Sequence, residues 1–228
     1  SKVKAGIETL DERLQFQLAF WGSRAAEEDF RALASDLLAE ADPRKEEWYL
    51  RAFRLRPWPL GIGALMPLVQ SPDPDVAYAA LYALRGRDEP EVKGLGLRYL
   101  KHPTFGGSAV RLLDATMSAD DLGALSAALE VERPEEDFHD FASPCLTLFA
   151  KDDFPFSEAQ GPMLTHIYEH ITCAECRQSA FEDLVDHQVA PDWMVEEACW
   201  DSRTNDDPEH PYIRQLARAE WAKRHPAT

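Results

Sequence analysis

A cluster of histidine and cysteine residues near position 170 is the part of the sequence best suited to metal chemistry. The pattern H-x3-H-x2-C-x2-C runs from His166 through His170 and Cys173 to Cys176. Zn²⁺ prefers four nitrogen or sulfur donors in a tetrahedron, so we name these four residues as a candidate zinc site. Two alternatives stay open. The C-x-x-C pair can act as a reactive dithiol at a helix start, or the cysteines can be small core residues beside polar histidines at a helix end.

A basic and aromatic segment runs from Arg44 to Trp58. Its arginines are Arg44, Arg51, Arg54 and Arg56. Arginine beside exposed aromatic rings binds phosphate and stacks on bases, which makes these four the candidate contacts for a nucleic acid. We favour a different interpretation, a solvated helix with a buried aromatic seam. Trp48 and Phe53 have the spacing of buried residues, and Glu47 lies one turn before Arg51.

Two acidic segments, at 130–140 and 192–209, form the third candidate site. They contain almost no basic residues. Such segments on a folded scaffold steer and orient a basic protein, although they also serve plain solubility. The candidate partner-binding residues are Glu130, Glu132, Glu135, Glu136, Asp137, Asp140, Asp192, Glu196 and Glu197.

Motifs for catalysis are missing from the sequence. It contains no G-x-S-x-G, no phosphate-binding loop, no G-x-G-x-x-G and no H-E-x-x-H. We therefore name no catalytic residue, and we expect a protein without enzymatic activity and without a cofactor, zinc being the alternative.

The charge balance limits the class of partner. The 228 residues include 41 acidic and 24 basic ones, which gives a net charge of −17. Phosphate backbones and anionic lipids attract positive charge, so this balance disfavours nucleic acid and membrane surfaces and favours a basic protein. No apolar run is long enough to span a bilayer and no secretory signal is seen, and four scattered cysteines suit a reducing compartment. We expect a cytoplasmic protein.

Apolar residues recur at helical spacing along nearly the whole chain, and no strand alternation is evident. The pattern predicts an all-α fold of stacked helix pairs in one domain, 1–228, with N-terminal capping helices (1–57), central repeats (58–151) and a C-terminal module (152–228). One stripe joins Leu10, Leu14, Leu18 and Trp21. Separate helical periods are predicted for 134–141 and 144–149.

Helix starts are predicted from capping residues. Asp42 before Pro43, Ser118 with Asp121, and Thr172 with Glu175 carry such signals, and Ser23 is a further candidate cap. Residues 73–84 and 89–100 repeat one pattern sixteen positions apart, so that Pro74 overlays Pro90.

The segment SPDPDVAYAALYAL (71–84) resembles the second helix of a HEAT repeat, and the segment from Glu89 looks like a weaker copy. It departs from that family where Arg commonly follows Val, since this chain has Ala77 and Lys93. The run YEHITCAECR (168–177), with 191–193 and 197–202, looks like a module of bacterial HEAT-type proteins of unassigned role.

This resemblance implies a right-handed α-α superhelix that holds a partner along a curved face. Nucleic-acid glycosylases with HEAT-like repeats also exist, which keeps the nucleic-acid alternative open. We expect a binding scaffold for a basic protein partner. One form of such a scaffold is an inhibitor or immunity-type protein that blocks a basic enzyme such as a nuclease.

Overall fold

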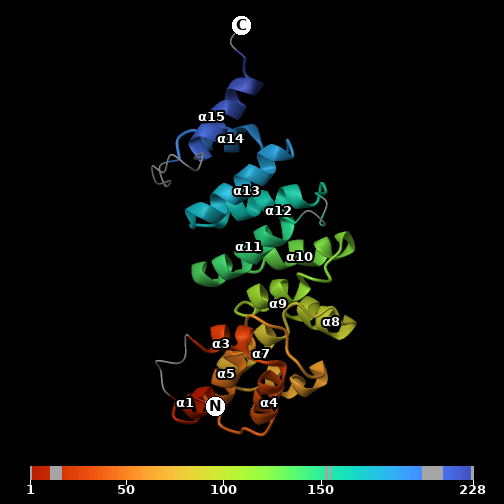
Figure 1. The fold of residues 1–228 in the computed structure, drawn as a ribbon. Helices are drawn as coiled ribbons and strands as arrows, with labels where there is room; N and C mark the ends of the chain where they lie inside the picture. Colours follow the sequence, from red (N-terminus) through yellow and green to blue (C-terminus); the bar gives the residue numbers. More distant parts are fainter. Residues whose placement is uncertain (1, 11–16, 152–153, 155, 202–212, 227–228) are drawn as a thin grey trace. The chain divides into compact units, whose positions relative to one another are not determined.

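The computed structural model describes residues 2–10, 17–151, 154, 156–201 and 213–226, and these residues form helices and loops without a β-strand (Figure 1). The predicted all-α class is therefore confirmed. The chain forms two compact units. Unit 1 comprises Ser1–Tyr99 and Ser108–Met117, and unit 2 comprises Leu100–Gly107 and Ser118–Thr228. Among the described residues, every helix is too short or too polar to pass through a lipid bilayer.

Unit 1 is built from seven α-helices and most of an eighth within its described residues. They are α1 (Lys2–Glu8), α3 (Leu18–Arg24), α4 (Glu27–Leu38), α5 (Pro43–Arg51), α6 (Met66–Val69), α7 (Pro74–Ala83), α8 (Pro90–Tyr99) and α9 (Gly106–Leu113), with the 3-10 turn η1 (Ile62–Ala64) before α6. The first two residues of α9 belong to unit 2.

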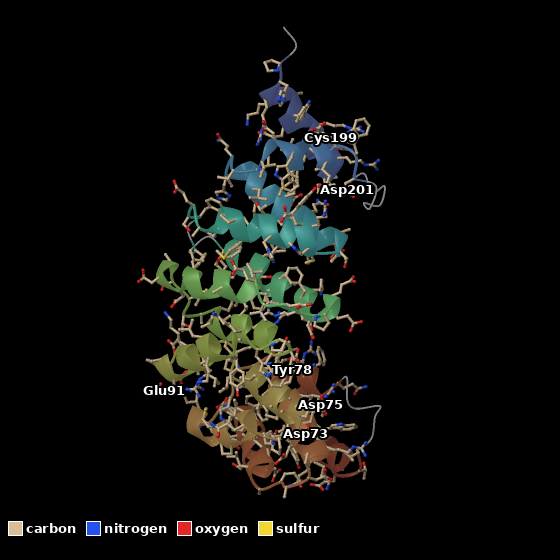
Figure 2. All side chains as sticks on the ribbon, turned by 180° about the vertical axis from the view of Figure 1, so that it is seen from behind. Asp73, Asp75, Tyr78, Glu91, Cys199 and Asp201 are labelled. Atoms are coloured by element: carbon tan, nitrogen blue, oxygen red, sulfur yellow. The ribbon has the colours of Figure 1, made fainter. Side chains whose placement is uncertain are left out.

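The helix starts in unit 1 follow the predicted capping chemistry. The Asp42 carboxylate accepts a hydrogen bond from the backbone N–H of Arg44, and Pro43 occupies the first turn of α5. Asp73 caps α7 in the same way, beside Asp75 (Figure 2). Pro74 and Pro90, which overlay in the sequence repeat, both begin a helix. A carboxylate at this position satisfies backbone donors that the helix itself leaves open.

The aromatic seam of unit 1 is buried, as predicted. Trp48, Phe53 and Trp58 are at most 5% exposed. The Phe53 ring lies 4.8 Å from the ring of Phe30 and 4.8 Å from that of Trp58, centroid to centroid. These rings fasten α4 and α5 to the loop that leads to α6, because large aromatic side chains contribute most apolar area to a core.

The N-terminal stripe does not form one helix. The helix α1 ends at Glu8, Leu10 has a left-handed backbone with φ of 50°, and α3 begins at Leu18. Leu14 lies outside the described residues. The capping prediction for Ser23 is wrong, because Ser23 lies inside α3 and Ala26 precedes α4.

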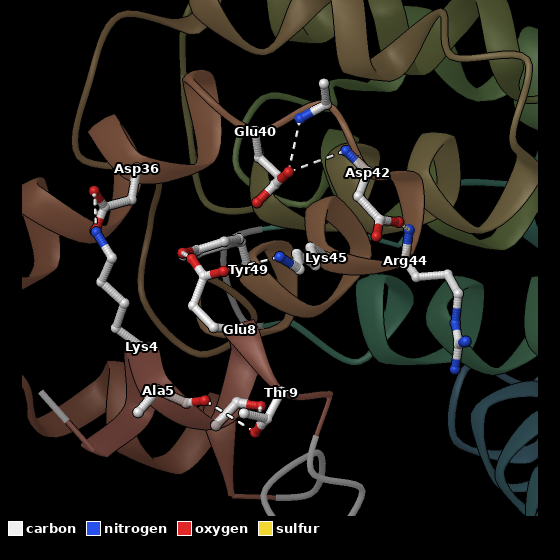
Figure 3. A network of polar contacts seen from close by, with 12 residues as sticks. Lys4, Ala5, Glu8, Thr9, Asp36, Glu40, Asp42, Arg44, Lys45 and Tyr49 are labelled. Carbon is white, nitrogen blue, oxygen red and sulfur yellow. Dashed lines mark hydrogen bonds and ion pairs between the residues drawn. The ribbon is translucent and has the colours of Figure 1, made fainter.

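Polar contacts connect α1 to α4 and α5 (Figure 3). The Lys4 ammonium lies 2.8 Å from Asp36, and the Lys45 ammonium lies 2.8 Å from Glu8. The Tyr49 hydroxyl donates to Glu8 over 3.3 Å. Burial and the nearby Glu8 charge raise the pKa of Tyr49 to about 12, so its hydroxyl stays a donor at neutral pH.

Unit 2 carries the remaining helices. They are η2 (Ala119–Asp121), α10 (Leu122–Leu129), α11 (Glu135–Phe149), α12 (Gln160–His170), α13 (Ala174–Asp186), α14 (Asp192–Ala198) and α15 (Ile213–Arg224). The predicted capping box is present, since Ser118 and Asp121 bond reciprocally at the start of η2.

The helix α11 runs unbroken through Pro144, where the sequence predicts two separate helical periods. That prediction is wrong. Pro144 has no N–H for the carbonyl of Asp140, four residues earlier. Gly107 lies against this carbonyl, and a Cβ on Gly107 would fall 2.2 Å from its oxygen. The Asp140 carbonyl, to which Pro144 cannot donate, thus lies beside a residue without a side chain.

A buried ion-pair network centres on Arg177 of α13. The Arg177 side chain is 5% exposed and its Nε lies 3.2 Å from Asp201, just after α14. A second ion pair joins it to Glu197, and it donates over 2.8 Å to the carbonyl of Tyr168. The guanidinium also lies 3.7 Å from the centroid of the Tyr168 ring. Arg177 thus connects α12, α13 and the end of α14.

Candidate functional site

A thiol–imidazole cluster lies between α11 and α13 in unit 2. His139 comes from α11, Cys173 from the N-cap of α13 and Cys176 from its first turn. One potential ligand atom from each residue lies within 4.8 Å of the other two. The Cys176 Sγ and the His139 Nε2 are 3.6 Å apart. Two helices that are distant in sequence therefore bring a nitrogen and two sulfur donors together.

The position of Cys173 depends on how α13 begins. The capping box predicted for Thr172 and Glu175 is wrong, because Cys173 is the N-cap residue and no side chain caps the helix. The Thr172 hydroxyl instead donates to the carboxylate of Glu135 on α11. This charge-assisted hydrogen bond holds Thr172 against α11, so that the next residue, Cys173, also lies close to α11.

The electrostatics of the cluster keep the Cys176 thiol protonated. Burial and the neighbouring Cys173 sulfur raise the pKa of Cys176 to about 12, against a hydrogen bond with Ser143 that lowers it. On the other side of the His139 ring, Nδ1 lies 3.9 Å from a carboxylate oxygen of Asp140. The other ring nitrogen, Nε2, faces the Cys176 sulfur.

A groove of about 480 Å³ extends from Cys176 along α11 and α13. Ser143 lines it, together with the acidic residues Glu175, Glu182 and Asp183. The groove is open to solvent and carries negative charge. A cation or a small polar solute can reach the cluster along it.

The predicted ligands His166 and His170 lie elsewhere. Their rings stack on each other with centroids 4.1 Å apart, and they lie 6.0 and 6.3 Å from the ring of Phe138. The structure thus brings together two of the four predicted zinc ligands, Cys173 and Cys176, and adds His139. Burial, together with the nearby His170, lowers the pKa of His166.

The stacked histidines form one wall of an acidic pocket of about 420 Å³ between α10, α11 and α12. Its lining residues are Leu129, Glu130, Val131, Glu132, Arg133, Glu135, Phe138, His166, His170 and Thr172. Three predicted partner-binding residues, the glutamates, therefore lie around one pocket with apolar and aromatic walls. The only arginine in its lining is directed to backbone oxygens, since Arg133 donates to the carbonyls of Ala128, Val131 and Leu100 at 2.6 to 3.0 Å.

The other predicted partner-binding residues are distributed over unit 2. Glu136 and Asp140 are exposed on α11, and Asp137 is half-buried there. Asp192 lies 2.8 Å from Arg224 of α15, and Glu197 pairs with Arg177. Glu196 is exposed on α14. Arginines within the chain thus offset the charge of Asp192 and Glu197.

The four arginines proposed to contact nucleic acid do not form a shared basic surface. Arg51 pairs with Glu47, and Arg56 pairs with Glu27 while lying 4.4 Å from the Phe30 ring centroid. Arg54 lies 5.2 Å from the Tyr82 ring centroid. Arg44 lines a small pocket together with Arg51, Glu47, Asp73 and Asp75. The surroundings of these cations are therefore mixed or acidic.

Comparison with known proteins gives no further assignment. No family model, curated protein or solved structure matches this chain.

Proposed function

We propose that this protein is a non-catalytic binding module of the helical-repeat type, and that the acidic pocket of unit 2 anchors a basic segment of a protein partner. The observation that carries the proposal is the convergence of Glu130, Glu132 and Glu135 on one pocket with apolar walls. A HEAT-type superhelix is the architecture that we propose for the scaffold. Its support is the pair of helices that start at the overlaid prolines.

The pocket has the composition that suits a long cationic side chain. Arginine and lysine place an aliphatic stem against apolar surface and keep the charge at the polar end. Leu129, Val131 and Phe138 supply the apolar surface. The three carboxylates supply the negative rim, and a guanidinium binds a carboxylate through two parallel hydrogen bonds.

The histidine pair supports the same ligand. Burial lowers the pKa of His166, so its imidazole is neutral at physiological pH. The neutral His166 ring next to Phe138 offers an aromatic face to a cation without repelling it. Protonation of the histidine pair would oppose the binding of a cation.

The net charge of −17 extends this attraction beyond the pocket. A strongly negative surface raises the association rate of a basic partner. Salt weakens this attraction, because at 0.1 M ionic strength charges more than about 10 Å apart are largely screened from each other. Capture of a basic enzyme such as a nuclease, in the manner of an inhibitor or immunity protein, is one form of this function. The nucleic-acid alternative finds no such support, because acidic residues surround Arg44 and Arg51.

The test uses a fluorescently labelled peptide that alternates arginine with leucine. The variant replaces the pocket carboxylates, Glu130→Gln with Glu132→Gln and Glu135→Gln. A matched control replaces three exposed acids of unit 1, Glu28→Gln with Asp29→Asn and Glu91→Gln. Both triple variants change the net charge equally.

We expect the pocket variant to weaken peptide binding by about tenfold or more and the control by about twofold or less, because close charge pairs contribute more than distant ones. Binding should weaken as salt rises in all three proteins. Equal loss in the two variants would show that the total charge acts and not the pocket, which would refute the proposal.

A further inference from the structure

We infer that His139, Cys173 and Cys176 form a zinc centre with three protein ligands and a fourth position that faces the groove beside Ser143. None of these three residues lines the acidic pocket, although Thr172 and Glu135, which position Cys173, do line it. The inferred zinc centre differs from the ligand set that the sequence pattern favours, because it uses a histidine from α11 and neither histidine of α12.

The spacing of the donor atoms fits a tetrahedral ion. With Zn–S near 2.3 Å and Zn–N near 2.05 Å, a tetrahedron places sulfur and nitrogen about 3.6 Å apart and two sulfurs about 3.8 Å apart. The distance between Cys176 Sγ and His139 Nε2 is 3.6 Å, and all three donor atoms lie within 4.8 Å of one another. Only small side-chain movements separate this cluster from a zinc site.

The donor types favour a soft or borderline ion. Two thiolates and one imidazole suit Zn²⁺ much better than Mg²⁺ or Ca²⁺, which take oxygen ligands. Two thiolates also balance the charge of Zn²⁺. The positive charge of the ion would stabilise the thiolate form of both cysteines.

The surroundings of the ligands are those of a metal site. A carboxylate oxygen of Asp140 lies 3.9 Å from the His139 Nδ1, on the side of the ring away from Cys176. Cys173 is fixed at the start of α13, because Thr172 bonds to Glu135 on α11. Glu175, Glu182 and Asp183 make the adjoining groove negative, which raises the local concentration of a divalent cation.

The fourth position lies on the groove side. Ser143 bonds to Cys176 and both residues line the groove, so a water molecule or a ligand atom from a bound solute reaches the ion there. Three protein ligands with one exchangeable position characterise zinc centres that bind or activate a ligand, whereas structural zinc centres have four protein ligands.

The experiment adds Zn²⁺ to the metal-free full chain in the presence of a chromophoric zinc chelator. We compare the wild type with His139→Ala and Cys176→Ser, and use His170→Ala as the matched control. The control removes a histidine of the sequence pattern that lies outside the cluster. Circular dichroism before zinc addition checks that each variant is folded.

We expect one Zn²⁺ per chain, protection of two thiols from alkylation and release of protons on binding at pH 7. His139→Ala and Cys176→Ser should weaken zinc binding by about a hundredfold or more, since even residues that merely orient ligands contribute 10–100-fold. His170→Ala should bind as the wild type does. His139→Cys, which keeps three donors, should retain most of the affinity.

Three results would overturn the inference. The first is the absence of stoichiometric zinc binding by the folded wild type. The second is a loss with His170→Ala as large as that with His139→Ala, which would restore the pattern of the sequence. The third is oxidation of Cys173 and Cys176 to a disulfide at the same rate with and without Zn²⁺, which would indicate a dithiol redox pair.

Discussion

Replacing Arg177 with methionine removes the cation at the centre of unit 2 and keeps most of its apolar length. Arg177 is 4% exposed as a residue, and the Asp201 side chain that it contacts is 3% exposed. The substitution leaves the Asp201 carboxylate without the guanidinium. It also removes the bond to the Tyr168 carbonyl and the cation above the Tyr168 ring.

The expected cost follows from the burial of this pair. Removing one partner of a buried ion pair costs about 3–5 kcal/mol, because the remaining buried charge loses that counter-ion. An exposed ion pair contributes about 0–1 kcal/mol. For a cooperative unit of about 120 residues, which is the size of unit 2, a loss of 3–5 kcal/mol lowers Tm by about 12–20 °C.

Thermal unfolding followed by circular dichroism, with urea unfolding as a second measure, tests this value. Arg218→Met serves as the control, because Arg218 is exposed on α15 and its loss should change stability by less than about 0.5 kcal/mol. A loss below about 1 kcal/mol for Arg177→Met would refute the argument that a buried cation holds these helices together.

Two further predictions concern a close backbone approach and a histidine. Gly107→Ala should destabilise the protein by about 2–3 kcal/mol, because its Cβ would lie 2.2 Å from the backbone oxygen of Asp140. Gly94→Ala should instead stabilise α8 by about 0.5–1 kcal/mol, because no atom lies within 4 Å of the added Cβ. Urea unfolding measures both variants, and equal changes in stability would contradict the packing argument. Folding lowers the pKa of His166 below its ordinary value of 6.5, so near and below pH 6.5 the unfolded chain binds more protons than the native one. Protonation of His166 therefore does not reduce the free energy of unfolding above pH 6.5, and it reduces it increasingly as the pH falls from there. Between pH 7 and 5.5 the wild type should therefore lose more stability than His166→Gln, and parallel curves for the two proteins would disprove this assignment.

The helical class and several helix starts could be predicted because they depend on local chemistry. Asp42 and Asp73 cap their helices with their own side chains, so a few neighbouring residues contain the whole signal. The unbroken α11 could not be predicted, because a proline is a local signal for a break. The close approach of Gly107 to α11 could not be predicted either, because Gly107 is distant in sequence.

The thiol–imidazole cluster shows the same limit. The C-x-x-C spacing identifies Cys173 and Cys176, but the sequence pattern points to the nearest histidines, His166 and His170, as the other ligands. His139 belongs to another helix, and only the packing of α11 against α13 brings it to the cysteines. A long-range contact of this kind leaves no periodic or spacing signal in a single sequence. The convergence of the glutamates on one pocket likewise required the arrangement of α10, α11 and α12.

The contact of Gly107 with the Asp140 carbonyl bears on how such a sequence can diverge during evolution. The position after Gly106 admits no side chain while α11 keeps its path, so descendants of this chain should retain a glycine there even if their binding partners change. In an alignment, that invariant glycine beside a helix start would resemble a phosphate-binding loop. The glycine would instead be retained because two backbones approach closely there. It should therefore not be counted as a functional residue.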